Sequence, residues 1–407
     1  MTRHHRLRGL AAVAAASAFA LLPAVPAQAD AIRDQQWGLE ALHTDRAWQT
    51  TRGGGITVAV LDTGVDDSHP DLTGQVLEGK DFIGFGAARG DRPWALHGTA
   101  MAGIIAGHGS GADGSEGVLG VAPEAKILPG RVILESTDPS RAKARRSRGT
   151  ALADGIRWAA DQGADVINLS LGDDSESAHP EPSEDAAVQY ALAKGVSVVA
   201  SAGNSGDKGD RPSYPAAYPG VIAVTAVDKY GTHAAFSTRR WYATVSAPGV
   251  DVVVANPDRH YYVEWGTSAA SAFVSGAVAL IRAAHPGLSP AQIKTLLTET
   301  AHDAPEGGRD DARGYGLVDP AAAIEAGAAP GADGPRAGSA AAGYRERYFG
   351  AGPTPEEERG GPAAWLAPVA GAGGAALLAL AVVLWRAGSG RTGRESGTFS
   401  TGFLGRR

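Results

Sequence analysis

Ser268 has a sequence environment suited to nucleophilic chemistry. Gly266 and Thr267 precede it, and an apolar helical stretch follows through Ile281. A serine at such a loop-to-helix junction can direct its hydroxyl into a cleft, where the positive end of the helix dipole favours an anion. Those are the requirements of an acyl-transfer nucleophile. Because an isolated Gly-Thr-Ser segment is an ordinary helix cap, the interpretation depends on residues elsewhere.

An acid and a base of matching type occur earlier in the chain. Asp62 follows the β-branched run at residues 56–61, which predicts a strand buried on both faces. Chemistry in α/β folds lies at the carboxyl ends of such strands, although Asp62 alone could equally form a turn. His97 opens a helix of small residues and can reach into a cleft. We prefer it as the base over His69, which lies in a turn-like segment and is expected to stabilise its own loop.

The elements that must position these residues alternate along the chain. Strands are predicted at residues 125–133, 165–170, 196–200 and 221–227, with helices at 150–162 and 183–194. This order predicts an α/β domain with a mostly parallel sheet and helices on both faces. A hairpin over 252–265 should lead to Ser268, and helices should follow at 268–285, at 290–299 and from Asp319 onwards.

The chain order Asp62, His97, Ser268 resembles that of the subtilisin family of serine proteases. The resemblance rests on Asp-Thr-Gly at 62–64, His-Gly-Thr at 97–99 and Gly-Thr-Ser at 266–268. It covers roughly residues 37–326, and this triad order is typical of the family. It implies a subtilisin-like fold and a serine endopeptidase. Ser268 would attack the peptide carbonyl, His97 would transfer the proton, and Asp62 would fix the imidazole.

The same resemblance implies roles for residues that border the cleft. Asn204 would donate its side-chain amide to the oxyanion beside the backbone N–H of Ser268, although an Asn-Ser-Gly sequence can also simply turn. The implied substrate-binding residues are Ser170, Leu171, Gly172, Ala202 and Gly203. Catalysis of this kind requires no metal and no organic cofactor. Many subtilisins carry structural calcium, but no motif in this sequence places such a site.

The first residues predict export from the cytoplasm. Arg3, Arg6 and Arg8 precede an apolar run, and a small-residue cleavage motif ends at Ala29. Residues 1–29 are therefore expected to be a secretory signal peptide, with an uncleaved N-terminal anchor as the alternative.

The remaining chain divides into five expected regions. Residues 30–52 are an N-terminal extension, 53–326 the subtilisin-like peptidase domain, and 327–362 a Gly/Ala/Pro-rich linker. Residues 363–385 carry no charge and, at about 1.5 Å per residue, are long enough to cross a bilayer core of about 30 Å. The basic tail at 386–407 should stay in the cytoplasm. These features predict a single-pass protein of the cell membrane with an extracytoplasmic catalytic domain.

This arrangement resembles the mycosins, which are membrane-anchored subtilases associated with type VII secretion in actinobacteria. It implies a polypeptide substrate, contact with membrane lipid through the C-terminal helix, and association with a type VII secretion membrane complex. The extension at 30–52 is too short for the prodomain that most secreted subtilisins carry.

Two features depart from the family pattern. Ala272 stands where proline is usual, and the chain lacks the cysteines of the mycosin disulfide. Alanine favours a helix, so we expect a straighter turn there, not an inactive enzyme.

Composition excludes several other classes of function. The chain has 407 residues and a net charge of −7, which gives no indication of a nucleic-acid-binding surface. The absence of cysteine excludes disulfides, cysteine nucleophiles and thiolate metal sites.

The basic run at residues 141–148 is interpreted as a solvated, mobile loop, with a processing or docking loop as the alternative.

Two other functions remain as alternatives to an endopeptidase. One is a non-enzymatic, subtilase-like scaffold that stabilises a secretion membrane complex. A pure scaffold has no physical need for an intact triad and Asn204, which favours activity. The other is a lipase or esterase, which would require Gly-x-Ser-x-Gly after a strand, and Ser268 lacks that setting.

Overall fold

The central feature of the computed structural model is a sheet of seven parallel strands. Residues 31–111 and 113–328 are described. The strand order is β2-β5-β1-β6-β7-β8-β9. The strands span Thr57–Asp62 (β1), Lys80–Asp81 (β2), Lys126–Arg131 (β5), Val166–Leu169 (β6), Ser197–Ser201 (β7), Ile222–Val227 (β8) and Ala243–Pro248 (β9). All residues of β6 to β9 are buried, as expected for a parallel sheet covered on both faces.

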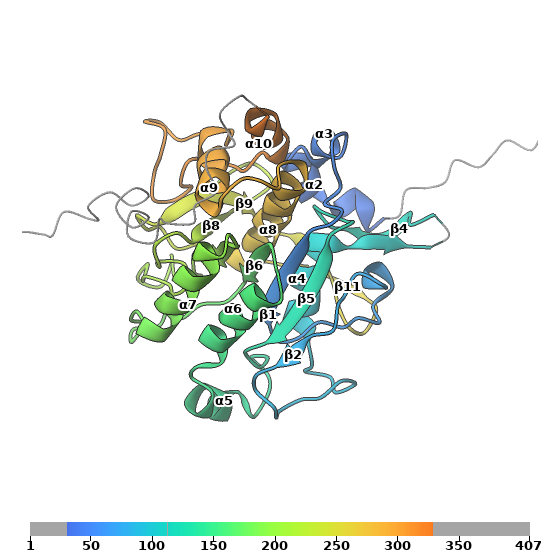
Figure 1. The fold of residues 1–407 in the computed structure, drawn as a ribbon, viewed down its shortest axis with the longest axis vertical. Coiled ribbons are helices and arrows are strands. Elements are labelled where there is room, and N and C mark those ends of the chain that lie inside the picture. Colours follow the sequence, from blue (N-terminus) through green and yellow to red (C-terminus); the bar gives the residue numbers. More distant parts are fainter. Residues whose placement is uncertain (1–30, 112, 329–407) are drawn as a thin grey trace, which may run out of the picture. The chain divides into compact units, whose positions relative to one another are not determined.

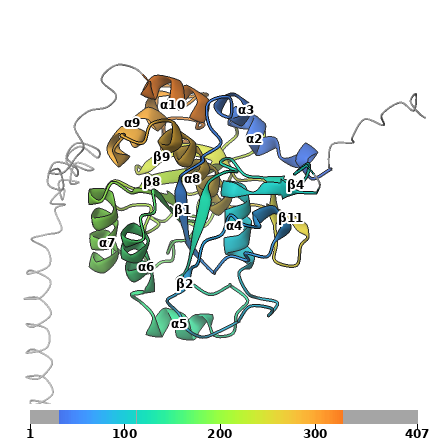
Figure 2. The ribbon, with the colours of Figure 1, turned by 45° about the vertical axis from the view of Figure 1, so that its right-hand side comes forward.

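Two helical layers cover this sheet (Figures 1 and 2). Alternate residues of β1 point to opposite faces, so Val58 and Val60 join one apolar core and Ala59 and Leu61 join the other. The first core includes residues of α4 (Leu96–Ala106) and α8 (Thr267–Ala284), and the second includes α6 (Ala151–Asp161) and α7 (Pro182–Ala193). The predicted mostly parallel α/β architecture is confirmed.

Helix α8 is the central helix of the domain. Within the described residues it alone is long and apolar enough to cross a membrane, with a mean hydropathy of 1.3, and 83% of it is buried inside the domain. It contacts β6, β7, β8 and β9. The helix is therefore apolar because it forms the core. The transmembrane helix predicted at 363–385 lies outside the described residues.

The N-terminal extension packs on the domain through three short helices and its tryptophans. These helices are η2 (Arg33–Gln35), α2 (Trp37–Ala41) and α3 (Thr44–Ala47). The indole of Trp48 donates to the carbonyl of Val121 at 2.8 Å, and that of Trp37 donates to the carbonyl of Asp251 at 3.2 Å. Arg33 Nε donates to the carbonyl of Gly117 at 2.8 Å. These hydrogen bonds fix the extension to segments far away in the sequence.

Several smaller elements complete the described fold. They are η3 (Pro70–Leu72), two antiparallel pairs formed by β3 (His108–Ser110) with β4 (Glu116–Leu119) and by β10 (Val252–Ala255) with β11 (Tyr261–Glu264), and the helices α9 (Pro290–Glu299) and α10 (Pro320–Gly327). The predicted hairpin before Ser268 and the two C-terminal helices are confirmed. Asp319 caps α10 by accepting the backbone N–H of Ala322 at 2.9 Å.

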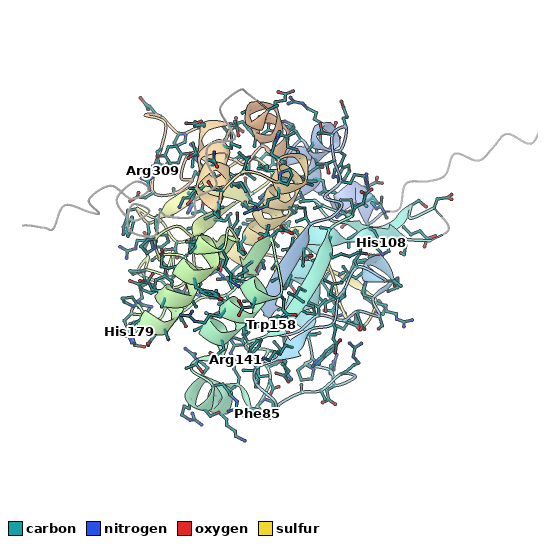
Figure 3. All side chains as sticks on the ribbon, viewed as in Figure 1. Phe85, His108, Arg141, Trp158, His179 and Arg309 are labelled. Carbon is teal, nitrogen blue, oxygen red and sulfur yellow. The ribbon has the colours of Figure 1, made fainter. Side chains whose placement is uncertain are left out.

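The interpretation of the basic run as a loop is wrong. Residues Arg141–Ser147 form helix α5. Its buried Ala144 and the hydrogen bond from Arg141 to the carbonyl of Leu134 hold the helix on the domain. Lys143 also lies over the ring of Phe85, with its Nζ 4.4 Å from the ring centroid. Figure 3 shows Phe85 and Arg141 at the same end of the molecule as α5. Contacts from several directions thus order a segment whose charge pattern suggested mobility.

Candidate active site

Asp62 and His97 come together at the carboxyl edge of the sheet. Asp62 is the last residue of β1 and is fully buried, while His97 is the second residue of α4. His97 Nδ1 lies 2.8 and 2.9 Å from the two carboxylate oxygens of Asp62. The carboxylate also accepts the backbone N–H of Thr63 at 2.7 Å. The acid therefore fixes the imidazole ring and leaves Nε2 as the nitrogen that can exchange a proton.

Gly98 allows this close approach of α4 to the end of β1. A side chain at Gly98 would collide with the carbonyl oxygen of Gly64, so only glycine fits there. Gly98 N–H donates to Thr63 Oγ1 at 3.1 Å, which ties the start of α4 to the end of β1. The Asp-Thr-Gly and His-Gly-Thr segments, which are far apart in sequence, form one packed unit.

Ser268 lies in the first turn of α8. The residue that caps this helix, Gly266, has φ +151° and ψ +154°, a conformation almost restricted to glycine. Ser268 Oγ donates to the carbonyl of Ser170 at 3.1 Å. In the described part of the chain no hydrogen bond joins Ser268 to His97. This is common in substrate-free active sites, where the catalytic hydrogen bond tightens on binding.

The amide of Asn204 is oriented by the residue that precedes Ser268. Its Oδ1 accepts from both the backbone N–H and the hydroxyl of Thr267, each at 3.0 Å. A backbone N–H can only donate, so the oxygen must face Thr267 and the NH₂ group must face away. A Cβ on Gly266 would lie 3.7 Å from the backbone nitrogen of Ser268 and 3.9 Å from Asn204 Nδ2. Both nitrogens thus border the same small space, as an oxyanion-binding pair requires.

A buried polar network beneath the serine was missed by sequence reasoning. The hydroxyl of Ser170 accepts from Asn168 Nδ2, donates to the carbonyl of Ser268 and contacts Ser271 Oγ, each at 2.9 Å. Ser275 Oγ donates to Asn168 Oδ1 at 2.9 Å. The Ser170 side chain therefore supports the first turn of α8 and is not free to contact a substrate. A polar residue inside the apolar run of β6 was the one signal that could have indicated this network.

The other predicted substrate-binding residues lie in the two segments that follow strands β6 and β7. Gly172 is exposed, and a Cβ there would collide with the hydroxyl of Ser213. Leu171 is half-buried, whereas Ala202 is fully buried. Gly203 has φ +108°, which favours glycine. Leu171 and Gly172 are therefore accessible to a ligand, whereas Ala202 and Gly203 are buried in this structure.

The electrostatics of His97 depend on three acids. Burial lowers the pKa of His97, whereas the charge and the hydrogen bond of Asp62 raise it. Glu135 and Glu264 add further negative potential, and together the acids raise the pKa of His97 to about 9. The sequence contained no motif that pointed to either glutamate. The imidazolium form of His97 is therefore strongly stabilised.

His69 lies apart from this pair. Its Nδ1 accepts the backbone N–H of Asp71 at 3.2 Å and caps η3, so it stabilises its own loop. Burial lowers the pKa of His69, although the charges of Asp71 and Asp66 oppose this effect. Among the described residues, no group of three or more His, Cys, Asp or Glu side chains is arranged to hold a metal ion.

A carboxylate–imidazole pair, a serine at a helix start and N–H donors beside that serine are the components that a hydrolase of the serine type requires. Comparison with known families agrees with this class. Residues 53–316 match the subtilase family model, described as Peptidase_S8. The chain belongs to the subtilase family of serine proteases.

Individual relatives have similar sequences and folds. The chain is 42% identical over 271 residues to a thermophilic serine proteinase of Bacillus sp. (strain AK1), covering 65% of this chain and 61% of that protein. It is 37% identical to thermitase of Thermoactinomyces vulgaris, covering 66% and 88%. A solved structure of the serine protease MycP1, described as an essential component of the type VII (ESX-1) secretion system, aligns with a TM-score of 0.61 at 32% identity, covering 74% and 90%.

Proposed function

We propose that this protein is a membrane-anchored, extracytoplasmic serine endopeptidase that cleaves polypeptides with the triad Asp62, His97 and Ser268. The observation that carries the proposal is the contact between the Asp62 carboxylate and the His97 imidazole. It is supported by the position of Ser268 at a helix start and by the paired donors of Asn204 and Ser268. Relatives named as serine proteinases share this family. The proposed chemistry draws only on groups of this chain.

The proposed reaction follows from the roles of these groups. Ser268 Oγ attacks the peptide carbonyl carbon while His97 Nε2 accepts the hydroxyl proton, and Asp62 stabilises the resulting imidazolium. The tetrahedral oxyanion accepts hydrogen bonds from Asn204 Nδ2 and the backbone N–H of Ser268. His97 then donates the proton to the leaving amine, and a water molecule hydrolyses the acyl-enzyme. The backbone of residues 170–172 would pair with the substrate, and Ala202 and Gly203 would border the pocket before the scissile bond.

A fluorophosphonate probe tests the proposal without knowledge of the natural substrate. The full-length protein in detergent should be labelled covalently at Ser268, because the probe reacts only with an activated serine. Pretreatment with a second serine-directed inhibitor should block labelling. An intact, folded protein that stays unlabelled from pH 7 to pH 10 would leave the non-enzymatic scaffold as the better interpretation.

The raised pKa of His97 predicts an alkaline pH profile. Only neutral imidazole accepts the serine proton, so kcat/KM should rise with pH and level off above about 9. At pH 7 the neutral fraction, and hence kcat/KM, should be about a hundredfold below the plateau. The measurement is kcat/KM against pH with a fluorogenic peptide. A rise in kcat/KM centred near pH 6.5 would show that the three acids do not raise the pKa of His97.

Membrane anchoring is supported by the sequence of the C-terminal region. The uncharged stretch at 363–385 is followed by Arg386, Arg391 and Arg394, and basic residues beside a span are retained in the cytoplasm. External protease on wall-free cells should therefore release the catalytic domain at the linker and leave a tag at Arg407 protected until the membrane is opened. Digestion of that tag from outside would exclude this topology.

Association with a secretion membrane complex is the most specific part of the proposal. It is supported by the likeness to MycP1, whose structure is described as that of an essential component of the type VII (ESX-1) secretion system, and by the predicted order of signal peptide, peptidase domain, linker and span in this sequence. A flexible linker reaches only about 5–6 Å × √n, so the site would stay within tens of ångströms of the bilayer. The enzyme would then cut proteins that emerge at its own membrane.

A further inference from the structure

The start of α4 is capped by two side chains from segments far away in the sequence, one directly after β1 and one after β5. Ala95, which precedes the helix, has φ +56° and only a methyl side chain, so it cannot cap the helix itself. The first N–H groups of a helix have no partner within the helix. The N–H of Gly98 donates to Thr63 Oγ1, and the N–H of His97 donates to Glu135 Oε1 at 2.9 Å. Glu135 lies in the segment after β5 and is 8% exposed.

We infer that Glu135 is a positioning residue for the proposed base: its carboxylate holds the backbone of His97 and adds a second negative charge beside the imidazole. The inference rests on the proposed function, because it assigns Glu135 a task in the same reaction. Asp62 fixes the ring of His97 from one side, and Glu135 fixes the main chain from which that ring extends. Together they leave the side chain little freedom to swing out of the site.

The segment that carries Glu135 is itself held in place. The backbone N–H of Asp138 donates to the carbonyl of Glu135 at 3.1 Å, and Asp138 Oδ2 accepts the N–H of Ala87 at 2.7 Å. Arg141 at the start of α5 donates to the carbonyl of Leu134. Neighbouring segments therefore immobilise both sides of Glu135, as a residue that must orient another one requires.

The charges around the imidazole explain why Glu135 should affect chemistry as well as geometry. The groups that face it are Asp62 at the end of β1, Glu135 after β5 and Glu264 on β11. All three favour the imidazolium, against the opposing effect of burial. Removing the charge of Glu135 should therefore make His97 easier to deprotonate. A residue with a purely structural role would not change the pH at which the base titrates.

Two substitutions separate the effect of the Glu135 charge from that of its hydrogen bond to the His97 N–H. Glu135→Gln keeps an oxygen that can accept the His97 N–H but removes the charge. We expect the rise of kcat/KM with pH to move to lower pH by several tenths of a unit, with KM unchanged. At pH 7 this variant should therefore retain a larger fraction of its own maximal activity than the wild type does. Glu135→Asp keeps the charge but falls short of the N–H. We expect the maximal kcat to fall, while the pH at which kcat/KM is half-maximal stays unchanged. Glu299→Gln, at an exposed position on α9, is the control for charge alone and should match the wild type.

The outcomes distinguish this inference from the proposed function. An unlabelled wild-type protein would overturn the proposed function. An active wild type whose acid limb is identical in Glu135→Gln would overturn the inference about charge and leave the protease assignment intact. A normal kcat in Glu135→Asp would overturn the inference about the backbone. Loss of folding in Glu135→Gln, checked by thermal unfolding, would also count against it, because a neutral acceptor of the same shape should preserve the helix start.

Discussion

Replacing Ser268 with alanine should abolish peptidase activity and fluorophosphonate labelling while leaving the fold intact. The loss in kcat should be on the order of 10⁶-fold, because no other group can form the acyl-enzyme. Ser268 Oγ makes one hydrogen bond, to the carbonyl of Ser170, and the network below uses the main chain of Ser268 instead. The thermal unfolding midpoint should therefore change little.

The control for this experiment is Ser115→Ala, at an exposed serine beside β4. It should keep wild-type activity and labelling. Labelling of the Ser268→Ala protein at the wild-type level would show that another serine is the nucleophile. A collapsed unfolding midpoint would show that the hydroxyl is structural, and the loss of activity would then carry no information on mechanism.

Replacing Asn204 with alanine should lower kcat by roughly 10²–10³ with little change in KM. The side-chain amide would bond the oxyanion only as charge develops on it, so its loss should fall on the chemical step. The measurement is steady-state kinetics on a peptide substrate at a pH above the His97 limb. A loss confined to KM would mean that Asn204 only positions substrate.

Two companion variants locate the effect in the amide nitrogen. Asn204→Asp keeps the oxygen that accepts from Thr267 but has no N–H to donate, so it should lose activity at least as severely. Thr267→Val removes one of the two hydrogen bonds that orient the amide and should cost far less. Equal losses in Thr267→Val and Asn204→Ala would instead point to collapse of the turn before Ser268.

Elements with strong local signals were predicted from sequence. The β-branched run before Asp62 forms β1, and α9 spans Pro290–Glu299 as predicted, because a serine cap and a proline at the first turn mark its start. Strand β9, with the sequence Ala-Thr-Val-Ser-Ala-Pro, was missed. Its residues are small and partly polar. They are buried because β9 lies beside β8 in the sheet and α8 packs against it, and no local sequence pattern indicates these contacts.

The candidate site likewise contains features that could be predicted from the sequence and features that could not. The order of Asp62, His97 and Ser268 could be read from their motifs, since each motif combines a reactive residue with the glycine or small residue that its turn requires. The part played by Glu135 could not, because its contact joins residues 38 positions apart and depends on how the segment after β5 folds back. The orientation of the Asn204 amide likewise depends on Thr267, a partner 63 positions away.

The parallel sheet has a consequence for when the enzyme becomes active. Parallel neighbours require long crossovers, so most stabilising contacts join distant parts of the chain and folding is slow. Helix α8, which carries Ser268, contacts β6, β7, β8 and β9. The nucleophile can therefore be aligned only after these strands have assembled. An unfolded or partly folded chain would be unable to cut itself or its neighbours, and proteolysis would begin only when folding of the domain is complete.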